Sequence, residues 1–434
     1  MADQSIGHLA NFVTLWVGYL SLVSRLQISQ TIGPMVVPLN IILTKFNEEY
    51  QETIGLINMF LNIFTFLITG SMVGFESLGS RAMGQGDLAK LNRLFKLALI
   101  TPFLIIIPIS YILLGITVYL EQEIENYPSV TLEMIYYARG MIIVLYPAFS
   151  FTAFWRYFLI RRLLNNTILS ALIGIVVFVG GVKLAEFVWL SFNHSIISIM
   201  IIGLNTGTVT IISTLVAIWY ICFYQPIIGF FRWDLNFGEL IEFIKLTVPG
   251  IIMTVLDGSF VEIAGLIANM AVSSIDFANY TLAISLYAMS GYLFISTGYV
   301  ITIETGRTIG RGKVEDCIDN FRYVLLGGLI LTLIFLLLAG MILTVIVPGT
   351  LLVGRSDEEL ENWFEICPFL IACSGLRVFS YFSNALIKGS GKQRTLSYFN
   401  LINYYLISIP ILYYLTFIRE WEIFGIWTGL IIGL

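Results

Sequence analysis

Long apolar runs are the feature that most constrains what this chain can fold into. A helix that spans a membrane needs roughly 20 consecutive, mostly apolar residues. Such runs lie near residues 51–75, 97–120, 133–160, 167–190, 196–223, 240–270, 278–303, 322–347, 363–387 and 395–418, with a shorter one at 423–434. A further apolar region, 9–44, is interrupted by Arg25, Gly33 and Pro34, and we interpret it as one long or broken helix. We therefore predict an all-α polytopic membrane protein with about twelve transmembrane helices, the last of them short or truncated.

The composition agrees with a membrane protein and excludes several other classes. The chain is 58% apolar and 12% charged, whereas soluble domains are roughly 45–50% apolar and about 25% charged. Its four cysteines have neither disulfide-framework nor metal-site spacing, and it has only two histidines. No nucleophile–base pattern is present either. We therefore expect no metal, no cofactor and no enzymatic activity.

Basic residues indicate the orientation of the chain. If the N-terminus is cytoplasmic, the cytoplasmic connections hold 15 Lys and Arg residues and the opposite side holds 4. The 4 are Lys45, Lys183, Arg355 and Arg419. An excess of Lys and Arg in cytoplasmic loops is the usual rule for membrane proteins. We therefore predict a multi-pass integral membrane protein with a cytoplasmic N-terminus.

One polar loop occurs twice. Residues 77–87, SLGSRAMGQGD, and residues 304–316, ETGRTIGRGKVED, share their arrangement of residues. Arg81, Gly84 and Gly86 recur 226 positions later as Arg307, Gly310 and Gly312. This offset makes the first six predicted spans correspond to the last six, in the same orientation. Parallel halves of this kind recur among transporters. We therefore predict an N-terminal lobe of residues 1–230 and a C-terminal lobe of residues 231–434.

The glycines of this loop have a structural interpretation. A phosphate-binding loop needs Gly-x4-Gly-Lys-Ser/Thr after a strand, and neither copy has that pattern. We expect the glycines to end one helix before the next begins. We also expect Glu76 and Glu304 to form local ion pairs with Arg81 and Arg307.

Four motifs, in order, carry a resemblance to a known family. They are ESLGSRAMGQG at 76–86, PGIIMTVLDGSFVEI at 249–263, GSGKQRTLSYFNLINYYLISIP at 389–410 and GIWTGL at 425–430. Together they resemble the multidrug and toxic compound extrusion (MATE) family, with a eukaryotic-like character. Arg81 departs from the family, which usually has Gln at this place, and the first 45 residues match poorly.

The resemblance implies a fold and a function. Family members have two six-helix lobes around a central cavity that opens alternately to each side. They extrude small organic molecules, commonly cationic, in exchange for protons or sodium. We accordingly expect a monomeric antiporter of a plasma or vacuolar-type membrane. Its partners would be a small organic substrate, coupling protons in preference to sodium, and the lipid bilayer, with no nucleic acid.

Two acids in the seventh span are the first candidates for ion coupling. Ionisable side chains inside the membrane are rare and are functional candidates by default. Asp257 lies near the middle of the 240–270 run, and Glu262 follows five residues later. Five residues correspond to about 500° of helical rotation, so the two acids point roughly 140° apart. We expect them to bind and release the coupling proton, the alternative being paired structural acids.

Arg377 complicates this site. By the resemblance, it occupies the place where animal-type members carry a third acid. We therefore hypothesise that Arg377 pairs with Asp257 or Glu262. Such pairing would replace an ion site by a fixed salt bridge, or shift the substrate preference toward anions. The alternative is that Arg377 packs against polar groups of the outer leaflet.

Other candidates are weaker. Asn205 and Tyr287 are the residues most suited to line a substrate cavity, and both could equally serve helix–helix contacts. The region 9–44 contains no Asp or Glu, so it lacks the acid that many bacterial and archaeal members carry on helix one. Coupling would then lie in the C-terminal lobe.

Three other functions remain open. A lipid-linked precursor flippase of the same superfamily would need a wide basic cavity. A transporter of the major facilitator type would need an Asp-Arg-x-Gly-Arg loop, which SRAMGQG lacks. A transport-impaired structural or sensor protein of the same fold is favoured by Arg377, by the missing helix-one acid and by the short last span.

Overall fold

The computed structural model describes residues 13–14, 16–17, 64–126, 131–163, 173, 176–185, 187–188, 195–223, 236–312, 314–350 and 357–434. All elements in these ranges are helical. Most of the region 9–44 and the first part of the run 51–75 lie outside the described residues. The chain divides into two compact units, Leu22–Ile251 and Met1–Ser21 with Ile252–Leu434. The lobe boundary at residue 230 stays a prediction.

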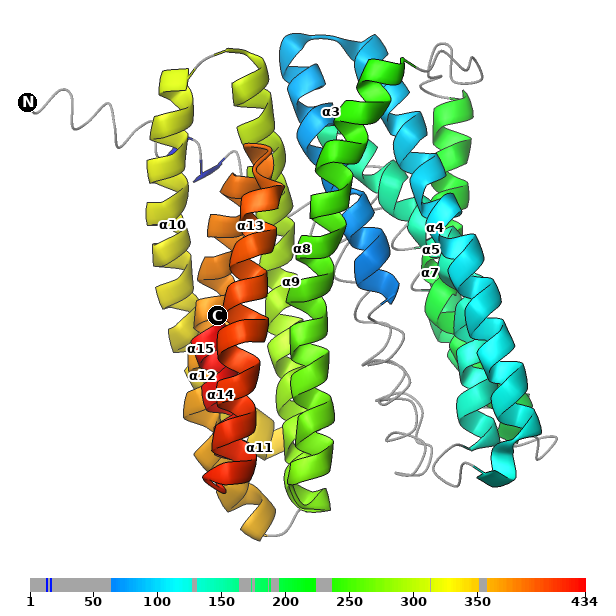
Figure 1. Cartoon of the computed structure of the whole chain (residues 1–434), viewed down its shortest axis with the longest axis vertical. Coiled ribbons are helices and arrows are strands. Elements are labelled where there is room, and N and C mark those ends of the chain that lie inside the picture. The colour runs from blue at the N-terminus through cyan, green and yellow to red at the C-terminus, as the bar shows by residue number, and fades with distance from the viewer. Residues whose placement is uncertain are drawn as a thin grey trace, which may run out of the picture. The chain divides into compact units, whose positions relative to one another are not determined.

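The first unit contains long, closely packed helices (Figure 1). They are α3 (Val73–Gln85), α4 (Leu88–Gln122), α5 (Leu132–Ile160), α7 (Ser195–Phe223) and the beginning of α8 (Phe237–Ala271). A one-turn 3-10 helix, η1 (Ile124–Asn126), follows α4. Helix α5 packs against α4 and α7. Gly140 of α5 and Gly203 of α7 allow close approach, because a Cβ at Gly140 would lie 2.6 Å from the carbonyl oxygen of Met200.

The second unit contains the rest of α8 and the C-terminal helices. These are α9 (Ser274–Gly310), α10 (Val314–Met341), α11 (Val347–Thr350), α12 (Asp357–Gly389), α13 (Gln393–Asn400), α14 (Ile409–Tyr413) and α15 (Glu422–Gly433). Three π-helical segments, η2 (Ile342–Ile346), η3 (Leu401–Ser408) and η4 (Tyr414–Ile418), continue these helices without a break. Helix α12 packs against α9, α10 and α15.

Five helical stretches in the described part are long and apolar enough to cross a membrane. They are Leu88–Gln122, Phe237–Ala271, Ile318–Ile346, Leu360–Gly389 and Gln393–Ile418. The apolar helix α15 has 12 residues. Together with the structural comparisons reported below, these helices confirm the predicted all-α polytopic class.

The repeated loop forms the expected turn in both copies. Gly86 and Gly312 have φ values of 78° and 74°, in the left-handed region that glycine adopts readily. Each donates its backbone N–H to a carbonyl in the last turn of the preceding helix, Gly86 to Met83 and Gly312 to Ile309. In the first copy, the Asp87 side chain also caps α4 by accepting the N–H of Lys90 at 2.8 Å. These glycines end helices, as the sequence predicted.

The two predicted local ion pairs had different outcomes. Arg307 contacts Glu304 at 2.8 Å, as expected for residues three apart on a helix. The prediction for Glu76 was wrong, because its partner is Arg156 of α5, and both side chains are 1% exposed. Residues five apart point about 140° away from each other, so Arg81 does not share the face on which Glu76 meets α5.

Candidate functional site

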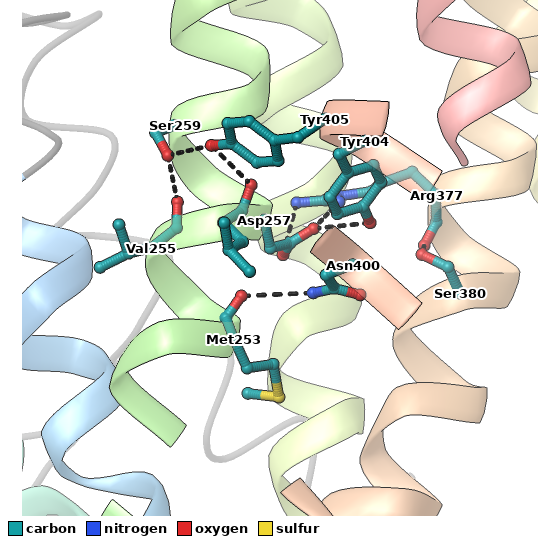
Figure 2. A network of polar contacts seen from close by, with 10 residues as sticks. Met253, Val255, Asp257, Ser259, Arg377, Ser380, Asn400, Tyr404 and Tyr405 are labelled. Atoms are coloured by element: carbon teal, nitrogen blue, oxygen red, sulfur yellow. Dashed lines mark hydrogen bonds and ion pairs between the residues drawn. The ribbon is translucent and has the colours of Figure 1, made fainter. Parts of the chain in front are cut away.

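A buried ion pair between α8 and α12 is the centre of the candidate site (Figure 2). Arg377 Nη1 lies 2.6 Å from Asp257 Oδ1, and Nη2 lies 3.1 Å from Oδ2. This two-pronged geometry suits a planar guanidinium and a carboxylate. The Arg377 side chain is 8% exposed and that of Asp257 is 22% exposed. The pairing hypothesised from the sequence is therefore present, and its partner is Asp257.

The helix that begins with α13 and continues into η3 places three polar side chains along α8. Tyr404 donates its hydroxyl to Asp257 Oδ1 at 3.0 Å. Asn400 donates its amide to the carbonyl oxygen of Met253 at 3.2 Å. The Tyr405 hydroxyl lies 2.6 Å from the hydroxyl of Ser259. Figure 2 shows these groups arranged around Asp257, so the salt bridge belongs to a larger polar network.

Arg377 is surrounded by aromatic rings. Its guanidinium lies 4.9 Å from the centre of the Tyr381 ring, within the range of a cation–π contact. Tyr287 of α9 is 6% exposed and lies close enough to Asp257 and Arg377 to feel the charge of both. The structure therefore brings together three of the predicted site residues, namely Asp257, Arg377 and Tyr287.

The charges that act on Asp257 are positive. In addition to Arg377, the ammonium group of Lys388 lies within electrostatic range of the Asp257 carboxylate. Arginine does not lose its proton in proteins. If Asp257 became neutral, the described surroundings would therefore hold an uncompensated buried cation.

Glu262 lies in different surroundings, as the angle between the two acids predicted. Its charge acts on Tyr280 of α9, whose side chain is fully buried. The Tyr280 ring centre lies 5.7 Å from that of Trp427 in α15. The Tyr280 hydroxyl and the Trp427 indole N–H are buried and make no hydrogen bond within the described part of the chain. The charge of Glu262 therefore acts on a buried hydroxyl that makes no hydrogen bond within the described part of the chain.

Asn205, the fifth predicted residue, lies in the other unit. It is 3% exposed and donates its amide to the carbonyl oxygen of Phe178 at 2.9 Å. Phe178 belongs to the apolar helix Val176–Ala185. Asn205 therefore contributes to a helix–helix contact, and its role in substrate binding stays a prediction.

Sequence reasoning did not assign Tyr381, Asn400 and Tyr404 to the site. Asn400 and Tyr404 belong to the motif 389–410, which was used only as a mark of the family. Asn400 and Tyr404 lie 23 and 27 residues after Arg377 and on another helix, and such a separation carries no signal of contact. Among the described residues, no group of three His, Cys, Asp or Glu side chains could hold a metal ion.

Comparisons of the sequence with known proteins give matches over less than half of the chain. No protein-family model matches the chain. Protein DETOXIFICATION 35 of Arabidopsis thaliana is 21% identical over 206 residues, which cover 46% of this chain and 40% of that protein. Human Multidrug and toxin extrusion protein 1 is 23% identical over 199 residues, which cover 44% and 33% of the two chains. The matched segments thus span well under half of these curated relatives.

Solved structures match nearly the whole chain. The eukaryotic MATE transporter AtDTX14 has a TM-score of 0.82 at 17% identity, covering 96% of this chain and 92% of that one. A MOP superfamily transporter from Pyrococcus furiosus, described as having a binding pocket of reverse polarity, has a TM-score of 0.77 at 15% identity and covers 95% and 92%. The chain thus has the fold of the MATE transporters, and its resemblance to the multidrug and toxic compound extrusion family is confirmed.

Proposed function

We propose that this chain extrudes small organic solutes across a membrane by alternating access, in exchange for protons. The MATE fold and the names of the curated relatives support extrusion of small molecules. The observation that carries the proposal is that the two acids of one membrane-spanning helix, α8, lie in different electrostatic surroundings. Asp257 is paired with Arg377, whereas Glu262 acts through its charge on the buried Tyr280.

Glu262 is the coupling group in this proposal. A single carboxylate cannot hold a proton and an organic cation at full strength together, because protonation removes the charge that attracts the cation. Binding of one therefore weakens binding of the other, and this competition is what an exchange mechanism requires. Organic cations are the substrates that follow from this arrangement.

The Asp257–Arg377 pair has a positioning role in the same mechanism. A proton on Asp257 would leave the guanidinium unpaired at a site where it is 8% exposed, and an unpaired buried charge is strongly destabilising. Asp257 therefore does not take up a proton alone. With Tyr404, the pair instead holds α8, α12 and η3 in register.

Transport in proteoliposomes tests this proposal. We expect an imposed pH gradient to drive accumulation of a fluorescent organic cation in vesicles that contain the wild-type chain. Glu262→Gln should abolish that dependence on the gradient, because the amide cannot bind a proton. Glu361→Gln, which neutralises an exposed acid of α12, is the matched control and should transport normally. Equal gradient-driven transport by all three proteins would contradict the proposal.

Export of organic anions is a second candidate function, favoured by Arg377 and Lys388. At the ion pair, a solute carboxylate could replace Asp257 on Arg377 while Asp257 takes up a proton. A proton and an anion would then bind together, whereas a proton and a cation compete at Glu262. The description of the Pyrococcus furiosus transporter as having a reverse-polarity pocket supports keeping this candidate.

The sign of proton exchange separates the two candidates. Calorimetry of solute binding in two buffers with different ionisation enthalpies counts the protons that move. We expect an organic cation such as tetraethylammonium to release protons on binding to the wild-type chain. Proton uptake with benzoate, lost in Arg377→Gln, would favour the anion candidate. If no solute binds or moves, the transport-impaired structural or sensor role becomes the better account.

A further inference from the structure

A cavity of about 280 Å³ lies away from the ion pair, where α9 and α12 end and α10 begins. It adjoins residues 388–394, which contain Lys388, Lys392 and Arg394 and which we call the basic turn. Its apolar walls include Ile309 of α9, Phe321 of α10, and Leu386 and Ile387 of α12. Its polar groups include Thr305 and Lys392. Phe321 is 48% exposed, so the cavity opens toward the surface.

Two of the three polar lining residues, Thr305 and Lys392, have side chains without a partner in the described part of the chain, whereas the Ser390 hydroxyl donates to the carbonyl oxygen of Ile387 at 2.9 Å. The Lys392 ammonium forms no ion pair, and the Thr305 hydroxyl forms no hydrogen bond, within the part of the chain that the structure describes.

Two further cations, Arg311 and Arg394, adjoin the cavity residues in sequence and are exposed. Neither makes an ion pair with a described residue. Asp319, which adjoins Phe321 in sequence, lies 3.9 Å from Arg322, so Lys392, Arg311 and Arg394 leave an excess of positive charge at the opening.

The position of the cavity relates it to the membrane surface. It lies at the basic-turn end of helices whose outward residues, such as Leu326 and Leu329 of α10, are apolar and exposed. This end carries the repeated loop and most of the Lys and Arg residues, so the positive-inside rule places it at the cytoplasmic leaflet. Anionic lipids are concentrated in that leaflet, and basic pockets between transmembrane helices bind their headgroups.

We infer that this cavity binds an anionic phospholipid. An acyl chain would lie against Ile309, Phe321, Leu386 and Ile387, and the phosphate would contact the Lys392 ammonium and the Thr305 hydroxyl. A soluble phosphate compound would use only the polar groups and leave the apolar walls exposed to water. A neutral phospholipid would leave the net positive charge at the opening uncompensated. The combination of apolar walls and unpaired cations therefore fits an anionic lipid better than a soluble phosphate compound or a neutral phospholipid.

Native mass spectrometry of the purified full chain tests this inference. After exchange into mixed micelles with equal phosphatidylglycerol and phosphatidylcholine of the same acyl chains, we expect the wild type to retain phosphatidylglycerol preferentially. Lys392→Gln should reduce this preference about fivefold, the effect of one basic residue near an anionic surface. Thr305→Val, which keeps the side-chain shape, should reduce it less. Lys245→Gln removes an exposed cation that does not line the cavity and should leave the preference unchanged.

Three results would overturn the inference. One is equal retention of the two lipids by the wild type, and another is an undiminished preference in Lys392→Gln. The third is displacement of bound phosphatidylglycerol by glycerol phosphate, which would identify a site for soluble phosphate compounds. None of these readouts depends on transport, so they are separate from the test of the proposed function.

Discussion

At the scale of single residues, Arg377 changes the role of Asp257. An isolated carboxylate in a membrane-spanning helix is available to protons and cations, whereas Asp257 is occupied on both oxygens by Arg377 and on one also by Tyr404. Because the guanidinium remains charged, the pair behaves as a unit. In the two functions proposed above, the intact pair is a structural clamp, or a solute carboxylate replaces Asp257 and makes Arg377 an anion site.

Removing one member of the pair should destabilise the protein. We expect Asp257→Asn to lower the free energy of unfolding by about 3–5 kcal/mol, because Arg377 is left buried and unpaired. The double variant Asp257→Asn with Arg377→Gln should be less destabilised than the sum of the two single variants. Thermal unfolding in detergent micelles measures both. Asp319→Asn, at a side chain that is 49% exposed, is the control and should change little.

Tyr404 offers a milder test of the same network. Tyr404→Phe removes the hydroxyl that donates to Asp257 and retains the ring that stacks on Phe260 at 4.6 Å. Hydrogen bonds to charged groups contribute about 1.5–3 kcal/mol, so we expect a loss of stability in that range in denaturant unfolding. A loss equal to that of Asp257→Asn would show instead that the ring position has been disturbed.

The sequence allowed part of this site to be predicted. An acid near the middle of a long apolar run stands out on its own, and Arg377 stands out for the same reason. Which acid Arg377 contacts depends on how α8 and α12 are rotated, and a single sequence does not report that rotation. Glu76 shows the same limit, because its partner Arg156 is 80 residues away and on another helix.

At the scale of helices, the apolar runs predicted where a helix lies better than they predicted how long that helix is. The run 240–270 corresponds closely to α8, Phe237–Ala271, whereas the run 97–120 lies within the longer α4, Leu88–Gln122. Hydropathy marks the part of a helix that suits the hydrocarbon core, and helix ends in water are polar. The π-helical segments η3 and η4 had no sequence signal.

Helix packing between α5 and α7 can be tested at Gly140. Because a Cβ there would approach the backbone of Met200 and Leu204 to 2.6 and 3.0 Å, Gly140→Ala should push the helices apart. Overpacking of this kind costs about 1–3 kcal/mol, measured as a lower unfolding midpoint. Gly115→Ala, where nothing lies within 4 Å, is the matched control. It should stabilise α4 by about 0.5–1 kcal/mol.

The repeated turns can be tested with a pair of equivalent variants. Gly86→Ala and Gly312→Ala place a Cβ in open space but at positive φ. The strain of a left-handed residue is roughly 1–2 kcal/mol, so both variants should lose a similar amount of stability. Thermal unfolding of both variants measures this loss. A loss of stability in only one variant would argue against equivalent turns.

At the scale of the whole molecule, the solved structures confirm the predicted all-α fold, whereas the two parallel halves stay a prediction. The 226-residue offset of the loop predicted parallel halves from the sequence alone, and the match to AtDTX14 covers 96% of the chain. The direction and identity of transported solutes do not follow from this architecture, because related folds carry different pocket chemistry. In the function proposed above, the class of solute depends on the charges that Glu262 and Arg377 provide.

Proton exchange through Glu262 is the central claim, and a solute-driven proton flux tests it most directly. Proteoliposomes are loaded with tetraethylammonium and a pH-sensitive dye and diluted into solute-free buffer without a pH gradient. We predict that the lumen acidifies as the cation leaves and protons enter, and that it does not in Glu262→Gln vesicles. Cation efflux without acidification in the wild type, or equal acidification in both, would contradict the account.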